Sequence, residues 1–141
     1  MERLMEKLDF LLDKYSVGEK VILKDRETAL FGGKEVPLLP HRAERRYTEL
    51  RNIVTGGTLE GVSMMKCECV AEKTSDVYEV LRREADIASF VLGRKIKSVA
   101  AAENENTLNA SAKTEDGVVI IFEIAATLSD EESEKCKHEV T

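Results

Sequence analysis

Hydrophobic and polar residues follow two different periods along this chain. In residues 1–15, apolar side chains recur every three or four positions, which is the spacing of one helical face. The same spacing returns in residues 41–55 and 76–92, and a glycine follows each of the three segments as a stop signal. Residues 61–71 instead alternate between two faces, which is the period of a strand. The pattern therefore predicts three helices, with a strand between the second and the third.

The remaining segments are predicted to be strands and turns. Residues 19–25 are expected to form a short strand. Residues 26–41 are expected to be irregular, with a turn at Gly32-Gly33 and with Pro37 and Pro40 as breakers of regular structure. Towards the C-terminus, strand patterns cover residues 95–102, 107–113, 118–128 and 135–141. An Asp116-Gly117 pair between two of these strands is typical of a tight hairpin. The last strand is expected at an edge of the sheet.

These elements indicate an α+β fold class, with a mostly antiparallel open sheet and two or three helices packed on one face. The sequence shows no internal repeat and no linker. Residues 1–141 are therefore expected to form a single domain, with a helix-strand lead-in at 1–40 and the main fold at 41–141. A chain of this length can bury a core of its own.

Charge and composition narrow the range of partners. The formal net charge is -6, and the Lys and Arg residues are scattered among Asp and Glu, which argues against nucleic-acid binding. No apolar run approaches the roughly 20 residues of a membrane-spanning helix, and the charged N-terminus is unlike a signal peptide. No membrane contact and a cytoplasmic location are therefore expected. The three cysteines are expected to be reduced thiols rather than a disulfide framework.

The predicted third helix carries charges in two different settings. The side opposite its apolar arc bears Glu79, Arg83, Asp86 and Phe90. Glu79 and Arg83 have the spacing of an i,i+4 ion pair, and an exposed, solvated pair is the simplest interpretation. Glu84 lies inside the apolar arc, where an unpaired carboxylate would be costly. We therefore expect Glu84 to be paired, with Arg82 or a lysine of the sheet, rather than to be a catalytic acid.

Four further residues are of types that ligate metal ions. Cys67 and Cys69 share one face of a strand, and so do Cys136 and His138. A zinc site could form if these two strands are neighbours. Their spacing differs from the C-x2-C turns of zinc ribbons, and small cysteines are common in cores, so we assign no metal to them. His41, at a helix start, is expected to cap that helix or to lie at the surface.

Three segments of the chain, taken in order, resemble a known family. They are YTELRNIVTGGTLEGV, DIASFVLGRKIKSVAA and TLNASAKTEDGVVIIFEIAATL. The first joins a helix to a glycine turn and strand, the second contains the pattern D-x-x-x-[WYF]-x-L-G, and the third is a hairpin with glycine at its tip. In these features the chain is similar to the C-terminal domain of the glucose-fructose oxidoreductase and inositol dehydrogenase family, Gfo/Idh/MocA. The resemblance covers about residues 41–141.

The resemblance also implies roles for residues of the third helix. The closing Asp of the family pattern corresponds to Asp86, its aromatic residue to Phe90 and its Gly to Gly93. The catalytic His of the family then corresponds to Arg83, and the catalytic Asp to Glu79. A guanidinium stays protonated and cannot serve as a general base. The resemblance therefore implies a degenerate catalytic pair, beside Asp86 and Phe90 on the substrate side of the helix.

The cofactor-binding part of the family has no counterpart in this sequence. Family members bind NAD(P) on a Rossmann domain whose E-K-P motif supplies a catalytic lysine, and neither that motif nor a G-x-G-x-x-G fingerprint occurs here. No cofactor is therefore expected in this chain, and NAD(P) only if a Rossmann-domain partner exists. The chain is expected to be either a fragment of a longer protein or a reduced homologue that acts as a binding or assembly module.

Three functional hypotheses follow. The leading one is an oxidoreductase-like substrate or dimerisation domain without independent catalysis. Val119 and Ile121 add apolar surface on the strand face opposite Val118 and Ile120, so a homodimer through the sheet is expected. The alternative is part of an NAD(P)-dependent sugar or polyol dehydrogenase that acts with a separate or missing Rossmann domain. A second alternative is a small α+β module that binds a metal or another ligand.

Overall fold

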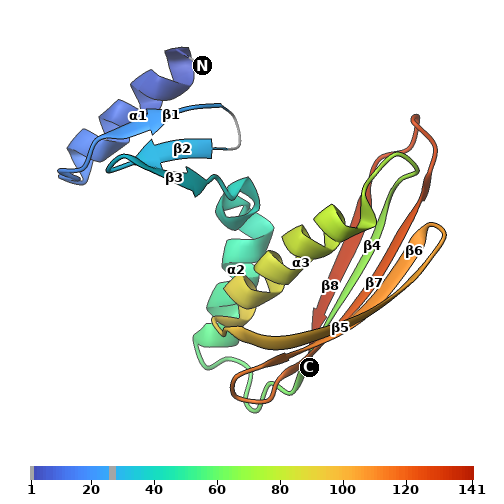
Figure 1. Cartoon of the computed structure of the whole chain (residues 1–141). Coiled ribbons are helices and arrows are strands. Elements are labelled where there is room, and N and C mark those ends of the chain that lie inside the picture. The colour runs from blue at the N-terminus through green and yellow to red at the C-terminus, as the bar shows by residue number, and fades with distance from the viewer. Residues whose placement is uncertain (1, 26–27) are drawn as a thin grey trace. The chain divides into compact units, whose positions relative to one another are not determined.

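The protein is described by a computed structural model that covers residues 2–25 and 28–141. The chain divides into two compact units, Met1–Pro40 and His41–Thr141. The boundary lies between Pro40 and His41. Each unit has its own elements, which are labelled in Figure 1.

The first unit contains a helix and a small antiparallel sheet. Helix α1 spans Glu2–Lys14. The strands are β1 (Val21–Leu23), β2 (Thr28–Phe31) and β3 (Lys34–Pro37), in the order β1-β2-β3. Gly32 and Gly33 form the turn between β2 and β3 with φ angles of 55° and 80°, a conformation that glycine adopts without steric cost.

The expectation of an irregular segment over residues 26–41 is wrong for most of that range. Residues 28–37 form a hairpin, and residues 26–27 lie outside the described residues. Proline was taken as a breaker of regular structure, but Pro37 ends β3, an edge strand, where its missing N–H leaves no ladder bond broken. The turn at Gly32-Gly33 is confirmed.

The second unit is an α+β structure built on five strands. Its elements are a 3-10 turn at Pro40–Ala43, α2 (Arg45–Thr55), β4 (Met64–Glu72), α3 (Val77–Leu92), β5 (Ile96–Asn104), β6 (Thr107–Thr114), β7 (Val119–Leu128) and β8 (Lys135–Val140). The strand order is β5-β6-β7-β4-β8. The α+β fold class is confirmed, and β8 lies at an edge as expected. The second helix begins at Arg45 rather than at His41, because the 3-10 turn precedes it.

The main sheet is mixed rather than purely antiparallel. Strand β4 pairs with β7 in parallel, and the other neighbours pair antiparallel. The chain direction explains the parallel pair. Helix α3 reverses the chain once after β4, and the turns that lead into β5, β6 and β7 each reverse it again, so β7 returns beside β4 in the same direction.

Helix α3 packs on one face of the sheet, and α2 packs against α3 (Figure 1). The side chain of Asp76 accepts a hydrogen bond of 2.9 Å from the backbone N–H of Tyr78 and so caps α3. Gly93 ends the helix with a φ of 64°. Between α3 and the sheet, the alternate residues Ile120, Phe122 and Ile124 of β7 are buried in the core. Among the described residues, no helix has the length and apolar character needed to cross a lipid bilayer.

Candidate functional site

A buried polar cluster lies between α3 and the strands β4 and β8. The antiparallel register of these strands places Cys67 directly opposite His138, and Cys69 directly opposite Cys136. Because alternate residues of a strand share a face, all four side chains point towards the helix. The two strands are therefore neighbours, which was the condition set for these four residues to come together.

Glu84 projects from α3 into this cluster and is fully buried. Its Oε2 atom shares a hydrogen bond of 2.6 Å with Nε2 of His138, and its Oε1 atom accepts one of 3.2 Å from Nη2 of Arg83. The expectation that Glu84 is paired is confirmed. The predicted partners are wrong, however, because neither Arg82 nor a lysine of the sheet contacts Glu84.

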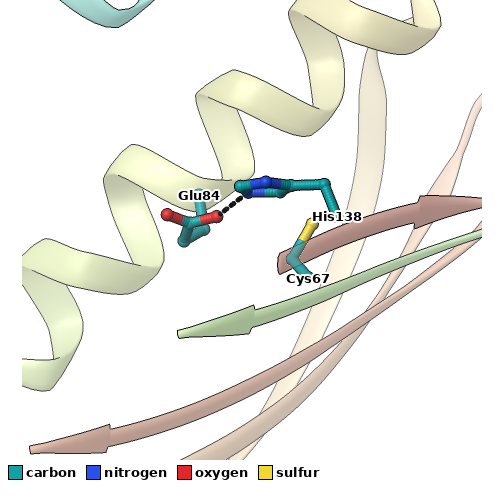
Figure 2. A group of neighbouring side chains, drawn as sticks. All are labelled: Cys67, Glu84 and His138. Carbon is teal, nitrogen blue, oxygen red and sulfur yellow. Dashed lines mark hydrogen bonds and ion pairs between the residues drawn. The ribbon is translucent and has the colours of Figure 1, made fainter. Parts of the chain in front are cut away.

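Figure 2 shows the sulfur of Cys67 beside the Glu84–His138 pair. A Cys67 sulfur, a Glu84 oxygen and a His138 nitrogen all lie within 4.8 Å of one another. Burial raises the pKa of the Cys67 thiol, and the nearby charge of Glu84 raises it further. The ring of His138 also meets Tyr47 edge-on, with ring centroids 5.2 Å apart, so the imidazole is held on two sides.

A disulfide joins Cys69 and Cys136 next to this cluster, and Cys67 is the free cysteine. The expectation that all three cysteines are reduced is therefore wrong for two of them. The pairing joins positions 67 residues apart, and only the alignment of β4 with β8 brings them together. No local sequence pattern specifies this alignment.

Arg83 lies against the disulfide. Its Nη2 atom is 3.3 Å from the sulfur of Cys69 and 3.6 Å from that of Cys136, and it also forms an ion pair with Glu134. The expected ion pair between Glu79 and Arg83 does not form. Glu79 instead lies 3.5 Å from Arg82 with most of its side chain in solvent. Sequence reasoning missed Glu134, which stands in the turn before β8 and matched no motif.

Asp86 contacts the 3-10 turn before α2, and Phe90 lines a shallow hollow with Arg42, Arg51 and Arg94. Asp86 bonds His41 at 2.5 Å, and Nε of Arg42 at 2.8 Å. The hydrogen bonds from Arg42 lower the pKa of the Asp86 carboxyl, with a smaller contribution from His41. Phe90 lies under the guanidinium groups of Arg42 and Arg51, at 5.5 and 4.8 Å from the ring centroid.

His41 is buried at 8% exposure, so the expectation that it caps a helix or lies at the surface is wrong.

The residues assigned to the exposed side of the third helix are not brought together at one point. Glu79 faces solvent, Arg83 faces β8, and Asp86 contacts the 3-10 turn before α2. Their catalytic assignment stays a prediction.

The arrangement has a definite chemical character. A carboxylate, an imidazole and a thiol are held out of water within a few ångströms, with a guanidinium on the outer side of the carboxylate. Such groups can share a proton or ligate a cation. Hollows on the sheet surface, at the end of α3 and on α1 are lined by other residues.

Comparison with known proteins supports the fold. No family model matches the chain, and no curated protein matches it by sequence. Solved structures do match. A probable dehydrogenase from Thermotoga maritima superposes on 72% of this chain with a TM-score of 0.61 and 14% identity. The chain has the fold of part of a dehydrogenase.

Two inositol dehydrogenases from Lactobacillus casei give the same result. The myo-inositol enzyme, solved with NAD(H) and myo-inositol, covers 72% of this chain at a TM-score of 0.60 and 15% identity. The scyllo-inositol enzyme covers 72% at a TM-score of 0.59 and 14% identity. Identities this low establish the fold alone. The matches span only 37%, 35% and 36% of the three dehydrogenases, so this chain corresponds to about a third of each.

Proposed function

We propose that this chain is an oxidoreductase-type substrate or dimerisation domain without catalysis of its own. The observation that carries the proposal is the match of this chain's fold to part of several dehydrogenases, which covers 72% of this chain but 37% or less of theirs. Folds of this kind host many functions, so the site and the surface must supply the rest of the argument.

The residue at position 83 of α3 argues against independent catalysis. A proton relay needs a group that can accept a proton near neutral pH, and a guanidinium at the position of the family's His cannot do so. Arg83 also forms ion pairs with Glu84 and Glu134, which makes it part of a partly buried ion-pair network. The sequence also has no dinucleotide fingerprint of its own.

The surface of the sheet supports a role in assembly. On the face opposite α3, the described elements of the second unit leave the centre of the sheet uncovered. A shallow hollow of about 450 Å³ lies there, among the small residues Ala100, Ala102 and Ser111 and beside the half-buried Ile121. On the same face Lys66 of β4 forms ion pairs with Glu68 and Glu123, and Lys135 lies towards the β8 edge, so the apolar side chain of Ile121 stands beside charged groups.

We therefore infer that two copies pair through this sheet face. Sedimentation velocity at tens of micromolar tests the inference. A particle of twice the chain mass of 15.8 kDa is expected. A monomer throughout that range would contradict it.

The alternative is that the chain belongs to an NAD(P)-dependent sugar or polyol dehydrogenase and acts with a separate Rossmann domain. It is favoured by the match to an enzyme solved with NAD(H) and myo-inositol, of which this chain covers 35%. Titration with NADH, followed by its fluorescence, is expected to show no binding to the isolated chain. Reduction of NAD by myo-inositol upon addition of a Rossmann-domain partner would establish the alternative over the leading proposal.

A further inference from the structure

The group formed by Cys67, Glu84 and His138 has the composition of a metal site. It contributes one sulfur, one oxygen and one nitrogen atom, all within 4.8 Å of one another. The three residues come from β4, α3 and β8, so three separate elements converge on one point. Thiolate and imidazole are ligands of zinc-type ions, whereas Mg²⁺ and Ca²⁺ take oxygen ligands.

A structural ion pair explains only part of this group. The Glu84–His138 pair is complete as a hydrogen bond, and buried pairs of this kind occur in proteins without any metal. Cys67 is what the pair does not explain. Its side chain is fully buried and directed at the pair, and among the described residues its thiol takes part in no hydrogen bond.

The distances suit a cation after a small adjustment. Zinc bonds of about 2.0 to 2.3 Å place neighbouring tetrahedral ligand atoms roughly 3.3 to 3.8 Å apart. Oε2 of Glu84 and Nε2 of His138 share a hydrogen bond of 2.6 Å, so they would have to separate by less than about 1 Å. The limit of 4.8 Å on all the ligand atoms leaves room for such edges.

We propose that Cys67, Glu84 and His138 bind a divalent transition-metal ion of the zinc type inside the second unit. Oε2 of Glu84, Nε2 of His138 and Sγ of Cys67 supply three bonds, and the fourth position of a tetrahedral ion is left to water. On binding, the thiol of Cys67 releases its proton to solvent. The proton shared by Oε2 of Glu84 and Nε2 of His138 leaves that hydrogen bond for Nδ1 of the ring, or for solvent where Nδ1 already carries a proton.

Arg83 acts on this site as a positioning residue. Its Nη2 atom donates to Oε1 of Glu84, which leaves Oε2 to face the other two ligands. Loss of a hydrogen-bonding partner that orients a ligating carboxylate commonly lowers metal affinity by about 10- to 100-fold. Tyr47 fixes the plane of the His138 ring from the other side.

The ion can enter from the edge of the sheet. Strand β8, which carries His138, is only six residues long and pairs with β4 alone in the main sheet. Opening of an edge strand costs less free energy than opening of a central one. Binding to the folded chain is therefore expected to be slow, and refolding in the presence of the ion is expected to load the site faster.

Cobalt(II) binding tests the proposal, because a thiolate bound to Co²⁺ gives an intense charge-transfer absorption. The chain is first stripped with a chelator and kept free of reductant, so that Cys69 and Cys136 stay joined and offer no thiolate. One equivalent of Co²⁺, added to the folded chain and during refolding, is expected to produce the absorption, and Zn²⁺ is expected to abolish it. Absence of the absorption in both preparations would overturn the proposal.

Substitutions locate the site. Cys67→Ser is expected to remove the charge-transfer absorption, and Glu84→Gln to weaken Co²⁺ binding by more than about tenfold. Glu134→Gln is the matched control, because Glu134 lies in the neighbouring group with Cys69 and Cys136 and outside the proposed ligands. Circular dichroism checks that each variant folds, and two ligand variants keep the test open if one does not. An absorption that survives in Cys67→Ser, or that is lost only in Glu134→Gln, would contradict the proposed ligands.

Discussion

Oε2 of Glu84 lies 2.6 Å from Nε2 of His138, and the two side chains retain 1% and 6% of their solvent exposure. The pair joins α3 to the edge strand β8 across 54 positions of sequence. Because each partner is buried, each depends on the other to offset the free energy of leaving water. This pair therefore couples the helix, the edge strand and the neighbouring cysteines.

Removal of one partner should destabilise the fold strongly. His138→Ala is expected to lower the free energy of unfolding by about 3 kcal/mol, because it leaves the Glu84 carboxylate buried with only Arg83 as its partner. Urea unfolding in the presence of a chelator measures the loss. The double variant Glu84→Leu/His138→Phe should recover most of it, since no buried charge then remains. A loss below about 0.5 kcal/mol for His138→Ala would show that the pair is not coupled to folding.

Reduction of the disulfide should also lower stability. The Cys69–Cys136 bond closes a loop over a separation of 67 residues. Chain entropy alone predicts about 4 kcal/mol for such a loop, and disulfides typically contribute about 2 to 4 kcal/mol. Urea unfolding with and without reductant is the measurement. Cys136→Ser should be insensitive to reductant, whereas Cys67→Ser should respond like the wild type. Thiol titration of the denatured, unreduced chain should find one free thiol; three would refute the pairing.

Arg83 should prove structural rather than catalytic. Arg83→His places a histidine at the position that corresponds, by resemblance only, to a catalytic His of the Gfo/Idh/MocA family. It is expected to lower the free energy of unfolding by about 1 to 2 kcal/mol, because Glu84 and Glu134 lose a charged donor. No oxidation of myo-inositol with NAD is expected from the variant. Arg82→His is the matched control: its side chain is 80% exposed, so a change within about 0.5 kcal/mol is expected. Turnover by Arg83→His alone would contradict the assignment.

The hairpin between β6 and β7 should respond to acid. Hydrogen bonds from Thr114 and from Arg94 lower the pKa of Asp116 below its ordinary value of 3.8. A lowered folded-state pKa means that the stabilisation is present above the ordinary value and is lost as the pH falls through the folded value. NMR titration of the Asp116 carboxyl is expected to give a midpoint below 3.8. In Asp116→Asn, the acid loss of stability should be smaller than in the wild type; an equal loss would assign it to other groups.

Local features of the fold were predictable from sequence, and long-range ones were not. The alternation of residues 61–71 and the turn at Asp116-Gly117 depend on neighbours a few positions away, and the structure has both. The hairpin over residues 28–37 was missed because a proline at the end of an edge strand was taken for a breaker.

The candidate site shows the same limit. Glu84 could be recognised as a residue in need of a partner, since a carboxylate lay within an apolar arc. The identity of that partner depended on the register of β4 against β8, which places His138 opposite Cys67. No local pattern specifies that register. The same register creates the disulfide that the cysteine count argued against.

The most direct test of the account concerns assembly through the open sheet face. Ile121 lies at the centre of that face, whereas Val99 is an exposed apolar residue of β5 paired with the buried Ala112, on the helix-covered side. Sedimentation equilibrium of the wild type, of Ile121→Lys and of the matched control Val99→Lys tests whether the open sheet face forms the dimer interface. The account predicts dimers for the wild type and for Val99→Lys and a monomer for Ile121→Lys. A wild type that stays monomeric at tens of micromolar, or an Ile121→Lys variant that still dimerises, would contradict it.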